Sequence, residues 1–130
     1  MTPRNLLCLA IAPLALAACT QERPDDRPAV SPAARVTGPA VNCVPITRLG
    51  ESRIRDDWTI DFMRDSKRGW RNVLPNRCSG LKSADAFTHK TSLSQLCSTD
   101  IIHVLDRIGN DLRKGAGCGL GQFIPIELEK

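Results

Sequence analysis

The sequence has no tyrosine, only two histidines and no Cys-x-x-Cys pair. Small metal-binding domains usually hold their ion with closely spaced cysteines and histidines, whereas His89 and His103 stand far apart here. These absences disfavour a metal site, and we expect neither a metal nor a cofactor. The chain also lacks a nucleophile-elbow motif, so the sequence suggests no catalytic residues and a protein that is not an enzyme.

Strong charge of either sign is also absent. The net charge is +4, and it falls to +3 if residues 1–18 are removed, because they contain Arg4 and no acid. Such a small excess is compatible with weak attraction to anionic lipid or cell-wall polymers, but nucleic-acid binding requires a concentrated basic surface. We therefore expect no nucleic-acid partner.

The chain begins with a pattern that resembles a bacterial lipoprotein export signal. Arg4 precedes the apolar run 6–16, which is too short to span a bilayer, and small residues then lead to Cys19. The pattern predicts a signal peptide over 1–18 and lipidation of Cys19, which would hold the protein on a membrane. An ordinary secretory signal and an uncleaved anchor are the alternatives. Thr20, in place of aspartate, favours the outer membrane and a domain that faces the periplasm.

Residues 19–41 predict a lipidated cysteine followed by a tether, because prolines recur through them and bulky apolar residues are scarce. An extended Pro-rich segment could hold the domain up to about 60–70 Å from its anchor. A solvated leader with no required length is the alternative. The folded domain is then expected over 42–130.

Once Cys8 is removed and Cys19 is lipidated, four cysteines remain: Cys43, Cys78, Cys97 and Cys118. An even number in a small exported domain predicts two disulfides. Three pairings are possible. We favour Cys78 with Cys97, which closes a compact excursion, and Cys43 with Cys118, which joins the ends of the domain.

Period-two patterns predict a mainly β fold, a small antiparallel barrel or sandwich of five to six strands stapled by disulfides. In residues 58–64, Trp58, Ile60 and Phe62 would face the core, with Thr59 and Asp61 on the solvent side. This strand would form a hairpin with 70–74. Residues 101–105 fit a central strand, and 124–128 fit a strand at an edge or beside a bulge, because Pro125 cannot donate to a ladder. Weaker strand candidates are 44–49, 53–55 and 86–90, and helices are possible at 83–87 or 105–112.

Glycine occupies every second position from Gly115 to Gly121, which leaves one side of an extended segment bare. We expect a core aromatic such as Trp58 or Trp70 to cover that side, or a flexible turn around Cys118. A phosphate cradle is disfavoured because the spacing does not match a Gly-x-Gly-x-x-Gly run.

The predicted hairpin carries a basic cluster that could contact anionic lipid or envelope polymers, with ordinary solvated charge as the alternative. Its members are Arg64, Lys67, Arg68, Arg71 and Arg77. His103 is expected to pack within a strand, and His89 could pair with a serine and an acid, although no motif fixes that geometry. Asp56 and Asp57 resemble paired carboxylates but are expected to form turn hydrogen bonds.

Five segments contain the cysteines, turn residues and core hydrophobics: 43–46 (CVPI), 56–60 (DDWTI), 71–78 (RNVLPNRC), 96–100 (LCSTD) and 118–126 (CGLGQFIPI). Together they resemble a family of small exported proteobacterial proteins with a domain of unknown function. Similar chains often have a tyrosine where this one has Trp70. The resemblance implies the domain boundaries and disulfides but no activity.

The combined expectation is a lipid-anchored cell-envelope domain that binds a protein or an envelope polymer without catalysis. An inhibitor or regulator of an envelope enzyme is the alternative, and a small hydrolase is a further one. The hydrolase would need a pocket that combines His89 or His103 with a carboxylate.

Overall fold

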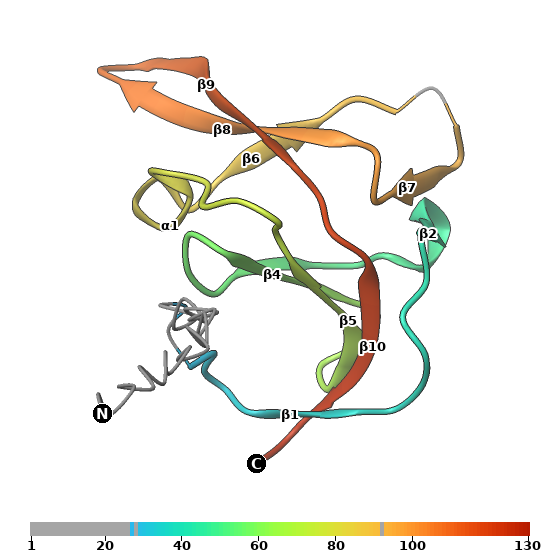
Figure 1. The fold of residues 1–130 in the computed structure, drawn as a ribbon. Coiled ribbons are helices and arrows are strands. Elements are labelled where there is room, and N and C mark those ends of the chain that lie inside the picture. Colours follow the sequence, from blue (N-terminus) through green and yellow to red (C-terminus); the bar gives the residue numbers. More distant parts are fainter. Residues whose placement is uncertain (1–26, 28, 92) are drawn as a thin grey trace, which may run out of the picture.

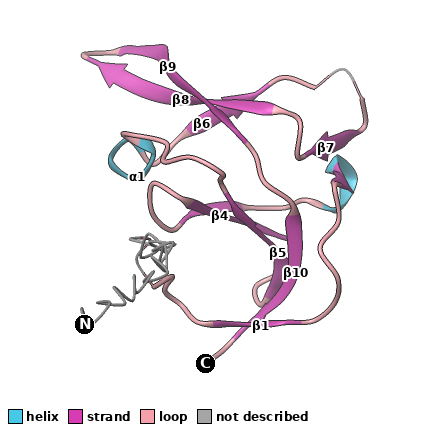
Figure 2. Cartoon of the chain, viewed as in Figure 1, coloured by secondary structure: helices cyan, strands magenta, loops and turns pink. Residues whose placement is uncertain are grey.

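In the computed structural model, the structure describes residues 27, 29–91 and 93–130, so the predicted signal peptide and Cys19 lie outside the described residues. The described part is mainly antiparallel β structure in three sheets, ordered β1-β10-β5-β4-β3, β2-β7 and β6-β8-β9. Figures 1 and 2 show the sheets stacked as in a sandwich. No described sheet closes into a barrel.

The elements are β1 (Ala34–Val36), β2 (Cys43–Pro45), η1 (Ile46–Arg48), β3 (Ser52–Ile54), β4 (Thr59–Met63), β5 (Arg68–Val73), α1 (Leu81–Ala84), β6 (Phe87–His89), β7 (Gln95–Cys97), β8 (Ile101–Ile108), β9 (Asp111–Gly119) and β10 (Phe123–Leu128).

The core lies between the five-stranded sheet and the three-stranded sheet. Phe62 of β4 is its centre, with ring centroids 5.5 Å from Phe123 and 6.0 Å from Phe87. Ile102 and Val104 of β8 are fully buried against it. The predicted β4–β5 hairpin and the central position of β8 are both confirmed.

The expectation that Asp61 faces solvent is wrong. All five residues of β4 are buried, and the exposed fraction of the Asp61 side chain is 0%. Asp61 Oδ2 accepts a hydrogen bond from Arg55 Nε at 2.7 Å, and Asp61 Oδ1 accepts one from Arg71 Nε at 2.8 Å. Two guanidinium groups therefore replace water around the carboxylate, which is what allows a charged residue to lie inside.

Part of the predicted tether belongs to the fold. Residues 34–36 form β1, which pairs with β10, so β10 lies between β1 and β5. The expectation that 124–128 is an edge strand is therefore wrong. The Pro125 carbonyl accepts the Thr37 N–H at 2.9 Å, beyond the last residue of β1. Thr37 is opposite Pro125 in the continued register, so proline removes only the return hydrogen bond to the Thr37 carbonyl, at the end of the β1–β10 ladder.

The predicted disulfide pairing is also wrong. Cys43 is bonded to Cys97 and Cys78 to Cys118. Cys43 and Cys97 are directly opposite each other in the β2–β7 pair. The second disulfide ties β9 to the loop that precedes α1. Strand pairing, rather than closeness in sequence, therefore sets the connectivity.

The helix considered over 105–112 is absent, because these residues form the ends of β8 and β9 and the turn at Gly109, where φ is 65°. A short helix occurs instead at Leu81–Ala84, slightly before the other candidate. No helix in the described part of the chain is long and apolar enough to cross a membrane.

No tryptophan covers the glycine row. A Cβ at Gly117 would meet the His103 imidazole, and one at Gly115 would meet the Asp106 carboxylate. Gly121 instead exchanges two hydrogen bonds with the buried Asn72 side chain, at 2.7 and 2.8 Å. The reason is that 111–119 is a strand paired with β8, so the side chains beside Gly117 and Gly115 come from β8 and not from a tryptophan.

Candidate functional site

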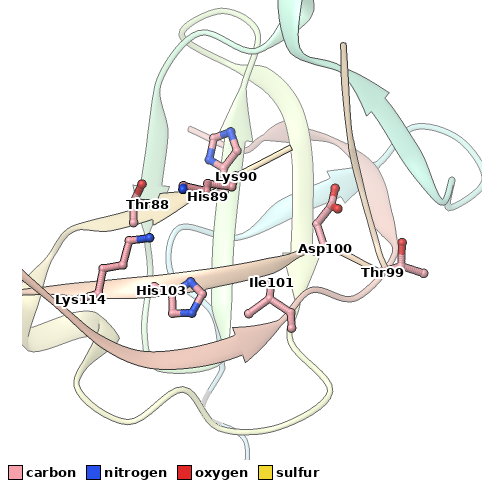
Figure 3. Close-up of a pocket in the computed structure, with 8 residues that line it drawn as sticks. All are labelled: Thr88, His89, Lys90, Thr99, Asp100, Ile101, His103 and Lys114. Atoms are coloured by element: carbon pink, nitrogen blue, oxygen red, sulfur yellow. The ribbon is translucent and has the colours of Figure 1, made fainter. Parts of the chain in front are cut away.

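A hollow with chemically active side chains lies on the outer side of the three-stranded sheet. It is an open groove of about 290 Å³ lined by Thr88, His89, Lys90, Thr99, Asp100, Ile101, His103 and Lys114. Figure 3 shows Lys114 and Asp100 at its two ends, with His103 and Ile101 between them along β8. The groove therefore offers two ammonium groups, hydroxyls and an imidazole, with one carboxylate at the rim.

Strand register determines which side chains reach this groove. Thr88 is opposite His103, and His103 is opposite Gly117, so all three lie on the same side of the sheet. A β-bulge follows, after which Leu105 is opposite Lys114. Positions 114 and 117 would face opposite sides of a regular strand, and the bulge brings Lys114 round to the groove.

The groove does not bring the two histidines together. His89 borders it, but His89 is opposite the buried Ile102, so its side chain belongs to the inner side of the sheet. There its ring centroid lies 6.5 Å from that of Phe87. His103 and Asp100 share the groove, although the Asp100 carboxylate accepts the Cys97 N–H at 2.7 Å and no hydrogen bond within the described part links it to His103.

The structure separates the predicted basic cluster. Arg71 Nη2 donates to Asp61 Oδ2 and to the Pro32 carbonyl, both at 3.0 Å. This guanidinium is therefore occupied by contacts within the domain. Arg77 pairs with Asp57 at 2.9 Å, away from the hairpin turn. At the turn itself, Arg68 and Arg64 lie 3.0 and 3.8 Å from Asp65. Among the five cations, Lys67 alone has no ion pair within the described residues.

The turn hydrogen bond expected of Asp56 and Asp57 is confirmed for Asp56, which accepts the Trp58 N–H at 2.7 Å, whereas Asp57 binds groups more distant in the sequence. The Asp57 carboxylate accepts the Lys82 N–H at 2.9 Å, and this bond, with the Arg77 ion pair, lowers the pKa of Asp57. Likewise, the backbone N–H groups of Lys67 and Arg68 lower the pKa of Asp65. Both carboxylates are thereby held in the charged form that neutralises the neighbouring arginines.

Several other cations without a partner among the described residues lie on or beside the β6-β8-β9 sheet. Within the described part of the chain, no hydrogen bond or ion pair is formed by the side chains of Lys90, Arg107, Arg113 and Lys114. Of these, Lys90 and Lys114 line the groove, and Arg107 is opposite Leu112 farther along β8. Sequence reasoning missed this set because Lys90 lies in a polar loop and the bulge decides the orientation of Lys114.

Metal binding has no evident ligand set here. No group of three or more His, Cys, Asp or Glu residues within the described ranges is arranged to hold a metal ion. In comparisons with known proteins, no family model, no curated protein and no solved structure matches the chain. The site must therefore be interpreted from its own geometry.

Proposed function

We propose that this protein is a lipid-anchored domain of the cell envelope that binds an anionic envelope component without catalysis. The binding surface is the groove face, which we define as the outer side of the β6-β8-β9 sheet. Its members are Thr88, Lys90, Ile101, His103, Leu105, Arg107, Leu112, Lys114, Gly117 and Gly119. The outer-membrane location and the anchor at Cys19 are part of the proposal and rest on the sequence pattern alone.

One observation favours this function above the others. The cations of the β4–β5 hairpin are mostly paired with acids, while Lys90, Arg107 and Lys114 have no partner among the described residues and share one face. Ionised groups that lack an internal partner remain available to an anionic ligand, because little must be broken to bind it.

Binding also fits the groove better than acid–base chemistry. A general base needs a partner that orients it and a position within hydrogen-bond reach of a substrate. Here the Asp100 carboxylate is held by a backbone N–H, and His103 lies over Gly117. The groove is shallow and cationic, which suits an extended or surface-bound anion.

Crosslinking in cells tests the proposal on the full chain. A photoreactive residue at Leu112 lies on the groove face, and one at Ile108 lies on the other side of the same hairpin, with nearly equal exposure of 58% and 57%. We expect adducts with an envelope component from position 112 and few from position 108. Equal labelling from both positions, or none from 112, would refute the groove face as the binding surface.

A further inference from the structure

The β8–β9 ribbon, defined as residues 105–114, separates its charges between two faces. Ile108 is opposite Asp111, and Asp106 is opposite Arg113, so these four side chains share one face. The other face, which belongs to the groove face, has Leu105 opposite Lys114 and Arg107 opposite Leu112. The groove face of the ribbon therefore carries cations and apolar side chains but no acid.

Exposed apolar residues lie among these cations. Ile101 is 53% exposed and Leu112 is 58% exposed, at either end of the groove face. The ribbon extends past β6, which pairs only with Ile102–Val104, and Figure 1 shows it standing clear of the body. All residues from 106 to 114 are exposed. Among the described residues that line the groove, Asp100 is the one acid, and it lies at the rim.

We propose that the groove face docks on the anionic surface of a lipid bilayer. This inference rests on the proposed function and names its ligand as the phosphate-bearing headgroups of the bilayer. Lys90, Lys114 and Arg107 would contact the phosphates, while Leu112 and Ile101 enter the interfacial region. Apolar side chains surrounded by basic ones form the usual pattern of a surface that lies in a membrane interface.

A bilayer matches the charge pattern in a further way. Each basic residue near an anionic surface strengthens attachment, and the attraction decays within a Debye length. A face with three unpaired cations and no strand acid is therefore attracted, while the opposite face of the ribbon, with Asp106 and Asp111, is not.

Amide hydrogen exchange of the full-length protein, bound to vesicles, provides the test. The protein is compared on phosphatidylcholine vesicles and on vesicles that also contain phosphatidylglycerol, so that any anchor acts equally in both. We expect exchange in residues 101–119 to slow at least threefold on the anionic vesicles, and the effect to disappear in high salt. Exchange in β5 should not differ.

Two neighbouring substitutions with the same charge change serve as a matched pair. Lys114→Glu acts on the groove face and Arg113→Glu on the opposite face. Loss of one interfacial cation weakens attachment of the domain about fivefold, so Lys114→Glu should remove most of the slowing of exchange in residues 101–119 on the anionic vesicles. Arg113→Glu should change it much less.

The outcomes separate this inference from the proposed function. Equal exchange on both vesicle types, or equal effects of the two substitutions, would overturn membrane docking. If position 112 nevertheless crosslinks to a protein or glycan, the proposed function stands with a different ligand. If neither the exchange test nor crosslinking from position 112 gives the expected result, the groove face is not a binding surface.

Discussion

His103 on β8 lies directly opposite Gly117 on β9, and its imidazole occupies the space beside the bare glycine: a Cβ at position 117 would lie 3.3 Å from His103 Nε2. Gly119 is on the same side of the strand, but a Cβ there would meet nothing within 4 Å. Glycine at position 117 therefore leaves room for the His103 ring, whereas no neighbouring side chain requires glycine at position 119.

Gly117→Val should displace the His103 ring, whereas Gly119→Val should not. Valine is favoured over glycine in strands, on a scale that spans about 1 kcal/mol, so neither change should unfold the protein. The NMR signals of the His103 imidazole report the displacement directly. A shift of equal size in both variants would show that the ring does not rest against Gly117.

Asp61→Asn should destabilise the protein strongly. The substitution leaves Arg55 and Arg71, whose side chains are only 15% and 12% exposed, without their compensating charge. Removing one partner of a buried ion pair costs about 3–5 kcal/mol. Denaturant unfolding measures the loss.

Glu127→Gln is the control for this change. It breaks the ion pair between Glu127 and Arg35, whose side chains are 40% and 66% exposed, and exposed pairs contribute about 0–1 kcal/mol. Similar losses in the two variants would contradict the burial of Asp61.

The period-two patterns predicted β4, β5 and β8, which pack on the core, because burial of one side of a strand produces alternation. They did not predict β7, although Leu96 is fully buried. The same reasoning missed β1, since Ala34–Val36 is short and mostly exposed and its pairing with β10 depends on backbone hydrogen bonds. It also placed Asp61 in solvent, because an alternating pattern cannot reveal that arginines from two other segments enclose the carboxylate.

The groove was still harder to predict. One inserted residue on β9 changes which side chains face outward, so alternation alone assigns Lys114 to the wrong side. The basic cluster of the β4–β5 hairpin was visible in the sequence, and so were the acids in and just before the hairpin, but not which arginine each acid binds. Which cations remain without a partner is therefore a property of the folded chain.

Asp57 should make the stability of the protein depend on pH under acidic conditions. Its pKa is lowered in the folded state by the Lys82 N–H and Arg77, so the charged form is favoured by folding. The stabilisation is complete above the ordinary aspartate pKa of about 3.9 and is lost as pH falls through the lower folded-state value. Unfolding of Asp57→Asn should differ from the native protein at pH 7 and converge with it near pH 2. A constant difference over this range would exclude the mechanism.

Disulfide mapping should find Cys43 with Cys97 and Cys78 with Cys118, and any peptide that joins Cys78 to Cys97 would contradict the structure. With sequence separations of 54 and 40, chain-entropy arguments assign each bond about 4 kcal/mol.

The two bonds should nevertheless differ in their effect on the groove face. Cys118 is within β9, next to Gly117, whereas the Cys43–Cys97 bond joins β2 and β7 away from the ribbon. Replacing Cys78 and Cys118 by alanine should therefore speed amide exchange in β9 and lower crosslinking from position 112. Replacing Cys43 and Cys97 should lower global stability by a similar amount without that selective effect, and the same exchange pattern in both variants would show that β9 is held by its pairing with β8 alone.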